Sequence, residues 1–143
     1  MANYDDSFGF LLKRAQHALE LTTERRLQSV GLTLAQYSAL AALEASDGKL
    51  SNAELARRCS VTAQTMHRVV ALLERNGWVT RKAHPRHGRI QDVILARKGK
   101  VTVVRAHKVV RGVEDAAFGA AAERDLRAAA KVMERALGTL DKA

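Results

Sequence analysis

The sequence contains a single proline, Pro85, which lies among histidines, arginines and a glycine in the stretch 82–92 (K-A-H-P-R-H-G-R-I-Q-D). Proline interrupts a helix or a central strand, so its absence elsewhere leaves the rest of the chain free to form long helices. Glycines mark several breaks in the helical pattern, at Gly31, Gly77 and Gly119. The chain is therefore expected to be mainly helical, with Pro85 in a connecting loop.

Apolar residues recur three and four positions apart at both ends of the chain, which predicts amphipathic helices there. The first helix covers about residues 6–29. The apolar stripes are Phe8, Leu12, Ala15, Leu19 and Thr22; then Val103, Ala106, Val110, Val113 and Ala117; and, beyond Gly119, Leu126, Ala130, Met133, Leu137 and Leu140. Packing within one subunit or pairing across a two-fold axis would cover these stripes, and we favour the dimer.

The middle of the chain predicts three helix starts and a helix-turn-helix. Thr33 with Gln36, and Ser51 with Glu54, have the form of capping boxes, and Thr62 is a third helix-capping residue. The helices after Ser51 and Thr62 are separated by a break of about three residues, and the second ends at Asn76–Gly77. Two helices joined by so short a break are typical of a helix-turn-helix.

The second of these helices combines an apolar face with a face of hydrogen-bonding residues. The positions expected to pack the helices together are Leu55, Ala56, Cys59, Val61, Met66 and Val69. The outward positions are Thr62, Gln64, Thr65, His67 and Arg68, with Arg75 at the far end. Such a helix can enter a DNA major groove, where Gln suits adenine and Arg suits guanine. A solvated polar face is the alternative interpretation.

Residues 78–96 predict a two-stranded β-hairpin. The segments W-V-T-R-K-A and R-I-Q-D-V-I-L-A are rich in β-forming residues, and the loop that contains Pro85 joins them. A ribbon directly after a helix-turn-helix is typical of the wing of a winged helix. Arg86 and Arg89 near its tip, with Arg81 and Lys82 on the strand, can reach a minor groove. Ser51, Lys82 and His87 are expected to contact the DNA backbone.

The positive charge of the chain is concentrated in the same region. Residues 51–111 contain fourteen Lys and Arg against three acids, a net charge of +11, while the segments on either side each carry a net charge of −1. Such a block is typical of a nucleic-acid-binding protein. A non-specific DNA-compacting protein is the alternative, although compaction would need only Lys and Arg on the helix face.

Other functions have less support in the sequence. His84 and His87 could share a metal, but no cysteine or carboxylate lies within their loop, and neither a metal site nor a cofactor is expected. No catalytic constellation is present, so an enzyme is not expected. Cys59 lies at a core position, which favours packing over redox sensing. The chain lacks a signal-peptide pattern and an 18-residue apolar run, which predicts a cytoplasmic protein without a membrane partner.

The sequence resembles the MarR family of winged helix-turn-helix transcription regulators over nearly its whole length. The resemblance is carried by L-T-L-A-Q-Y-S-A-L, by L-S-N-A-E-L-A-R-R-C-S-V-T, and by V-A-L-L-E-R-N-G-W-V-T-R with the wing after it. It implies a homodimer in which residues 62–75 enter the major groove of a near-palindromic operator and Arg86 enters the flanking minor groove. It also implies repression that is relieved or modulated by a small, often phenolic, effector bound between the dimerisation helices and the winged domain.

Two positions depart from the family pattern. His84 stands where the family usually has the Asp that orients the wing arginine. A histidine at this position can gain a positive charge as pH falls, which predicts tighter DNA binding in acid. Leu95-Ala96-Arg97-Lys98-Gly99 lacks the usual cap threonine, so the next helix is expected to fray at its start, at a cost of about 1 kcal/mol. The family's peroxide sensors carry a cysteine in the first helix, which this chain lacks.

The expected fold class is mainly α with a small β-wing, a winged helix-turn-helix domain plus N- and C-terminal dimerisation helices. Residues 1–143 are expected to form a single MarR-type domain. Its parts are the dimerisation helices 6–30 and 97–141, the winged helix-turn-helix 33–96 and, within it, the wing hairpin 78–96. His17 and Arg14 are candidates for facing an effector pocket, and a solvated helix face explains them equally well.

Overall fold

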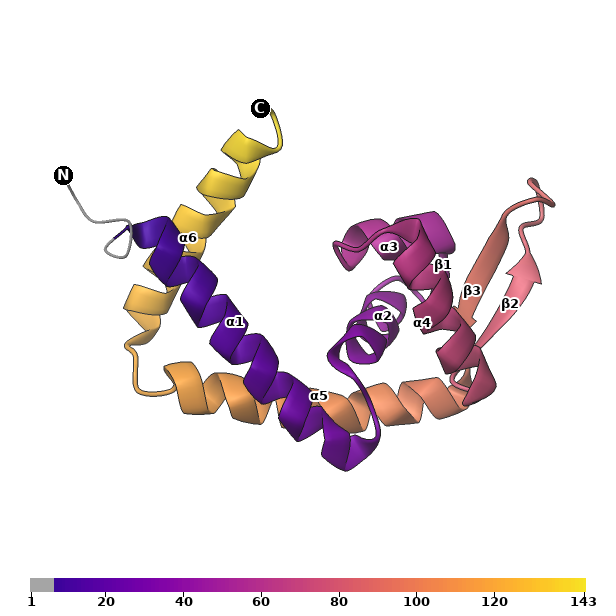
Figure 1. Ribbon diagram of the computed structural model, residues 1–143, viewed down its shortest axis with the longest axis horizontal. Coiled ribbons are helices and arrows are strands. Elements are labelled where there is room, and N and C mark those ends of the chain that lie inside the picture. The colour runs from indigo at the N-terminus through magenta and orange to yellow at the C-terminus, as the bar shows by residue number, and fades with distance from the viewer. Residues whose placement is uncertain (1–6) are drawn as a thin grey trace. The chain divides into compact units, whose positions relative to one another are not determined.

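The computed structural model describes residues 7–143, and the chain divides into two compact units between Val113 and Glu114. Figure 1 labels the helices and strands. The first unit contains α1 (Phe8–Leu27), the 3-10 helix η2 (Gln28–Val30), α2 (Leu34–Glu44), β1 (Lys49–Ser51), α3 (Asn52–Arg58), α4 (Ala63–Arg75), β2 (Val79–Ala83), β3 (Gln91–Leu95) and most of α5 (Arg97–Phe118). The second contains the end of α5 and α6 (Glu123–Leu140). The predicted class, mainly helical with a β-wing, is confirmed.

Side-chain caps fix the starts of the first helices, as the sequence predicted. Thr33 and Gln36 form the predicted capping box: Gln36 N–H donates to Thr33 Oγ1 at 3.1 Å and Thr33 N–H donates to Gln36 Oε1 at 3.0 Å. Ser51 caps α3 by accepting from Glu54 N–H at 3.2 Å. Within residues 7–143, no bond runs back from Ser51 to the Glu54 carboxylate. The second capping box is therefore only half formed.

The sheet has three antiparallel strands in the order β1-β3-β2, rather than the two strands predicted. Strands β2 and β3 form the predicted hairpin, with Val79 opposite Leu95 and Ala83 opposite Gln91. The additional strand β1 pairs with β3 and places Leu50, which is 6% exposed, opposite Val93. Its three residues are too few for a recognisable alternation, so local sequence gave no signal for this strand.

The core of the first unit lies where α2, α3, α4 and the sheet meet. Of the predicted packing positions, Leu55, Ala56, Met66 and Val69 are buried, while Cys59 and Val61 are half-buried. Val70 and Leu73 of α4 are also buried and extend the same face of the helix by one turn. Helices α3 and α4 are separated by residues 59–62, which confirms the helix-turn-helix.

Tertiary contacts hold the start of α5, which was expected to fray. Ala96 N–H donates to the Trp78 carbonyl oxygen at 2.9 Å, and Lys98 Nζ donates to the Asn76 carbonyl oxygen at 3.0 Å. Gly99 packs so closely that a Cβ there would overlap the Trp78 carbonyl oxygen. Asn76 and Trp78, which precede β2, thus hold the start of α5 in place.

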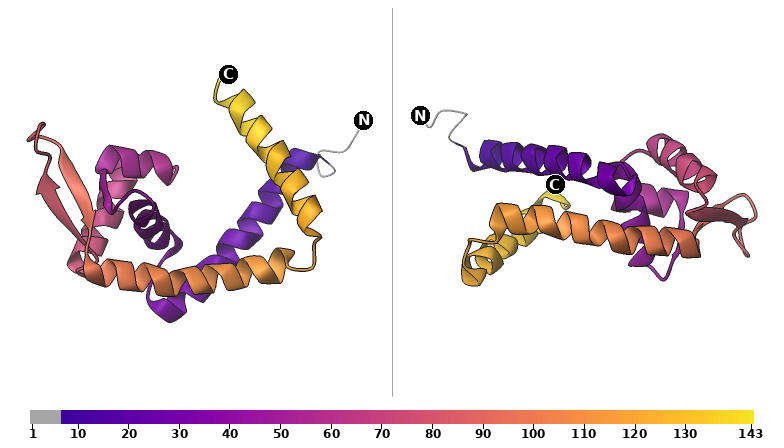
Figure 2. Two further views of the ribbon diagram at one scale, coloured as in Figure 1. Left: turned by 180° about the vertical axis from the view of Figure 1, so that it is seen from behind. Right: turned by 90° about the horizontal axis from the view of Figure 1, so that it is seen from below.

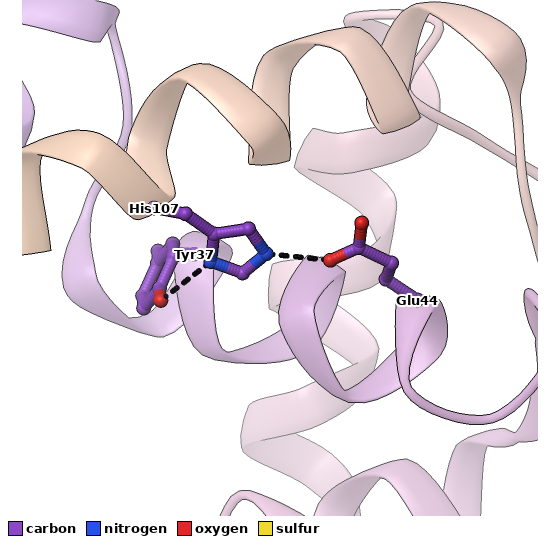
Figure 3. A network of polar contacts seen from close by, with 3 residues as sticks. All are labelled: Tyr37, Glu44 and His107. Atoms are coloured by element: carbon purple, nitrogen blue, oxygen red, sulfur yellow. Dashed lines mark hydrogen bonds and ion pairs between the residues drawn. The ribbon is translucent and has the colours of Figure 1, made fainter. Parts of the chain in front are cut away.

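A polar network joins α5 to α2 within the first unit (Figure 3). Tyr37 Oη lies 3.0 Å from His107 Nδ1, and His107 Nε2 lies 2.5 Å from Glu44 Oε2. The Tyr37 and His107 rings also meet edge to face, with their centroids 5.6 Å apart. Together with the buried Val103 and Ala106, this network fixes the position of α5 on the helix-turn-helix core.

The apolar stripes predicted at the chain ends are largely uncovered. On α1, Phe8 and Leu12 are 60% and 41% exposed, and the buried residues of this helix are Thr23 and Leu27. On α6, Leu137 and Leu140 are 60% and 69% exposed, and Met133 alone among Glu123–Leu140 is partly buried. On α5, by contrast, Val103, Ala106 and Val113 are buried.

Candidate nucleic-acid interface

Helix α4 presents its apolar face to the core and its polar face to solvent. Met66, Val69, Val70 and Leu73 are buried. The predicted groove-facing residues are all exposed, namely Thr62, Gln64, Thr65, His67 and Arg68. The structure therefore brings these five side chains together on the open side of one helix, mostly within its first two turns.

The hydroxyl groups at the start of α4 are occupied by the cap. Thr62 Oγ1 accepts from Thr65 N–H at 3.1 Å and donates to Thr65 Oγ1 at 2.9 Å. In contrast, the side chains of Gln64, His67 and Arg68 make no hydrogen bond or ion pair with residues 7–143. The cap orders the helix end, and these three side chains keep their hydrogen-bonding groups available for base edges.

A side chain that the sequence analysis did not identify also ties α3 to α4. Asn52 Nδ2 donates to the Ala63 carbonyl oxygen at 3.2 Å, across the turn. Within that turn Ser60 adopts a left-handed conformation, with φ 55°. Asn52 and Ala63 are brought together only by the geometry of the turn. The local sequence around Asn52 therefore could not predict this contact.

The wing carries the second group of predicted residues at its tip. The loop between β2 and β3 projects beyond α3 and α4 (Figure 2). His84 N–H donates to the Ile90 carbonyl oxygen and Ile90 N–H donates to the His87 carbonyl oxygen, both at 2.8 Å. Arg86, His87 and Arg89 are exposed on this loop and Lys82 is exposed on β2. Ser51 is half-buried, and its hydroxyl caps α3.

Arg81, which was expected to act with Lys82, is placed close to α4 by a contact that the sequence did not predict. It is half-buried, its Nε lies 3.7 Å from Glu74 Oε1 of α4, and this Nε has no hydrogen-bond partner. Arg81 thus connects the wing to the end of the recognition helix. Next to it lies a cavity of about 420 Å³, which is also lined by Asn52, His67 and Arg89.

Other chemistry has little support in the described residues. Burial raises the pKa of the Cys59 thiol above its ordinary value, which disfavours the reactive thiolate. Within residues 7–143, no group of three or more His, Cys, Asp and Glu is placed to hold a metal ion. Over the same residues, no helix is long and apolar enough to cross a membrane.

A recognition helix with an open polar face, followed by a basic wing, defines a winged helix DNA-binding protein. A family model described as the MarR family matches residues 30–90. The HTH-type transcriptional repressor Rv2887 of Mycobacterium tuberculosis is 39% identical over 110 residues, which are 77% of this chain and 78% of that protein. The chain belongs to the MarR family.

Solved structures of other proteins share the fold. The transcriptional repressor CouR, bound to a 23-mer DNA duplex, is 27% identical with a TM-score of 0.81, and the match covers 96% of both chains. Bordetella bronchiseptica BpsR, whose DNA binding is regulated by 6-hydroxynicotinic acid, is 19% identical with a TM-score of 0.84, and the match covers 94% of this chain and 96% of that one. The chain is a DNA-binding transcription regulator and not an enzyme, as the sequence predicted.

Proposed function

We propose that this protein is a homodimeric repressor that binds a near-palindromic operator, with α4 in the major groove and the wing tip in the adjacent minor groove. The observation that carries the proposal is the exposed face of α4, where Gln64, His67 and Arg68 have no partner within residues 7–143. A varied set of donors and acceptors suits base readout, whereas a compacting protein would need only positive charge. The repressor Rv2887 and the DNA-bound repressor CouR support the same assignment.

Dimer formation is supported by the apolar residues that a single chain leaves uncovered. Phe8, Leu11 and Leu12 on α1, and Leu126, Leu137 and Leu140 on α6, are each at least 40% exposed. Moving a fully exposed leucine into a core contributes about 1.5–3 kcal/mol, so these partly exposed residues would each add a share of that to contact between two copies. Residues 6–30 and 97–141 are accordingly proposed as the dimerisation helices of a single MarR-type domain.

Effector binding is proposed at a cavity of about 650 Å³ in the first unit. It is bounded by Gln16, Glu20 and Glu24 of α1, by α2, and by the turn between α3 and α4. A ligand there would touch both the proposed dimerisation helix and the turn that places α4. The bordering carboxylates favour a ligand with hydroxyl donors, such as a phenol. His17 and Arg14, the earlier candidates, are not among its lining residues.

Selection of bound sequences from a library of random duplex DNA tests the proposal. A two-fold symmetric consensus, with half-sites about one helical turn apart, is the expected result for a dimer that reads two major grooves. Recovery of unrelated sequences after repeated rounds would favour the compacting alternative. Phenolic compounds that release the selected duplex would then identify the effector class.

A further inference from the structure

The wing tip contains a hydrogen bond from the backbone of Arg86 to the side chain of His84. Arg86 N–H donates to His84 Nδ1 at 3.1 Å, across Pro85. Pro85 has a fixed φ and no N–H of its own, so this bond closes a turn around it. An Asp or Asn side chain commonly closes such a turn by accepting from the N–H two residues on. Here an imidazole supplies the acceptor.

The bond places a requirement on the protonation state of His84. Nδ1 can accept only while it has a free lone pair, which is the case in a neutral ring with its hydrogen on Nε2. A doubly protonated ring carries N–H on both nitrogens, and its Nδ1–H would then face the Arg86 N–H. Protonation therefore removes the acceptor, as well as adding a positive charge.

No carboxylate lies within the loop, residues 84–90, to replace His84 Nδ1 as the acceptor. The charged and titratable groups nearby are Arg86, His87 and Arg89 of the loop, and Lys82 opposite Asp92 on the strands. The His87 ring lies 5.4 Å from the His84 ring, tilted by 31°. All of these groups except Asp92 are basic, and Asp92 is buried in the sheet. His84 Nδ1 is thus the side-chain acceptor that the structure provides for the Arg86 N–H.

We propose that neutral His84 is the positioning residue for Arg86, so that protonation of His84 releases the wing arginine and weakens DNA binding. The inference rests on the proposed role of Arg86 in the minor groove. Its sign is opposite to the expectation from charge alone, which was tighter binding in acid. A free Arg86 would have to be ordered on the DNA at a cost in conformational entropy, which the preformed turn avoids.

Three proteins test the proposal: the wild type, His84→Asn and His84→Leu. Asn keeps an acceptor for the turn but does not titrate, while Leu has no acceptor. We measure Kd for the selected duplex at constant salt between about pH 8 and about pH 5.5, the range in which histidines change charge. At the upper end the wild type and His84→Asn should bind alike, and His84→Leu should bind about fivefold more weakly for each wing, or roughly 25-fold for a dimer that loses one hydrogen bond in each subunit.

At the acid end the wild type should bind more weakly than His84→Asn by the same factor, about fivefold for each wing and roughly 25-fold for the dimer. Reporting the ratio of the two Kd values removes the pH effects that both proteins share. A ratio that is constant across the pH range, or a His84→Leu protein that matches the wild type at high pH, overturns the inference. Thermal unfolding of each variant establishes that it is folded.

Arg86→Ala separates this inference from the proposed function. If Arg86→Ala leaves Kd unchanged, the minor-groove role of Arg86 fails, and the inference fails with it. If Arg86→Ala weakens binding while the His84 variants follow the wild type, only the inference fails. If the minor-groove role of Arg86 and the inference about His84 are both correct, the His84 substitutions should have no further effect on Kd in the Arg86→Ala background.

Discussion

On the first turns of α4, capping and readout are divided between different side chains. The Thr62 and Thr65 hydroxyls bond to each other and to the backbone, which orders the helix end. Gln64 and Arg68 lie four residues apart on the exposed face and are free to contact bases. Replacing either threonine should therefore affect helix stability and DNA affinity together, whereas replacing Gln64 or Arg68 should affect affinity alone.

Arg68→Ala and Lys82→Ala should weaken DNA binding in different ways. Arg68 is proposed to contact a base, so its loss should cost about 1–3 kcal/mol on the selected duplex and relax the preference at one position of each half-site. Lys82 is proposed to contact phosphate, so its loss should weaken all sequences alike and reduce the salt slope by about one for each subunit. Equal effects of the two substitutions on random and selected DNA would contradict this assignment.

Cys59 should behave as a half-buried thiol with a raised pKa rather than as a sensor. Burial raises its pKa, so the thiolate that attacks disulfide reagents is scarcer than in an exposed cysteine at the same pH. Its reaction with such a reagent should be slower in the native protein than in denaturant. Because the pKa of this half-buried thiol is higher in the folded protein, it favours folding below its ordinary pKa, and this contribution should decline above about pH 8.5. Equal native and denatured rates would contradict the prediction.

Among the structural elements, α5 depends most on a close approach to the chain before the wing. Gly99 meets the Trp78 carbonyl, and Trp78 also accepts from Ala96 N–H. This contact connects the start of the helix to the root of β2, so a shift in α5 would move the wing. It explains how the helix begins without a threonine cap.

Gly99→Ala and Gly112→Ala, both in α5, should change stability in opposite directions. A Cβ at Gly99 overlaps the backbone at Trp78, which should lower the free energy of unfolding by about 1–3 kcal/mol. A Cβ at Gly112 meets nothing within 4 Å, so the gain in helix propensity should raise it by about 0.5–1 kcal/mol. Denaturant unfolding measures both. Similar changes in the two proteins would mean that the contact at Gly99 is not tight.

Elements defined by their own sequence were predictable, and those defined by distant partners were not. The Thr33 capping box, the Thr62 cap and the hairpin follow from neighbouring residues and were confirmed. Strand β1 forms by pairing with β3, and the Arg81 side chain lies near the Glu74 carboxylate of α4. Similarly, the bond from Arg86 to His84 depends on a ring orientation that the letters H-P-R do not determine.

For the whole molecule, the exposed leucines of α6 predict a dimer in solution. Sedimentation at micromolar concentration should give twice the mass of one chain. Leu137→Glu should shift the protein towards monomer, because it places a charge on a surface proposed to be buried between copies. Leu72→Glu is the matched control, since Leu72 is 42% exposed on α4, outside the proposed dimerisation helices. A monomeric wild type, or two variants that behave alike, would contradict the proposed dimer.

The central claim is that the dimer recognises a DNA sequence rather than DNA charge. The most direct measurement is competition at physiological salt, in which unlabelled random duplex displaces the protein from its selected duplex. A specific regulator should need at least ~10³-fold more random than selected competitor. If random duplex competes within about tenfold of the selected one, the +11 charge of residues 51–111 accounts for binding, and the proposed readout by α4 is wrong.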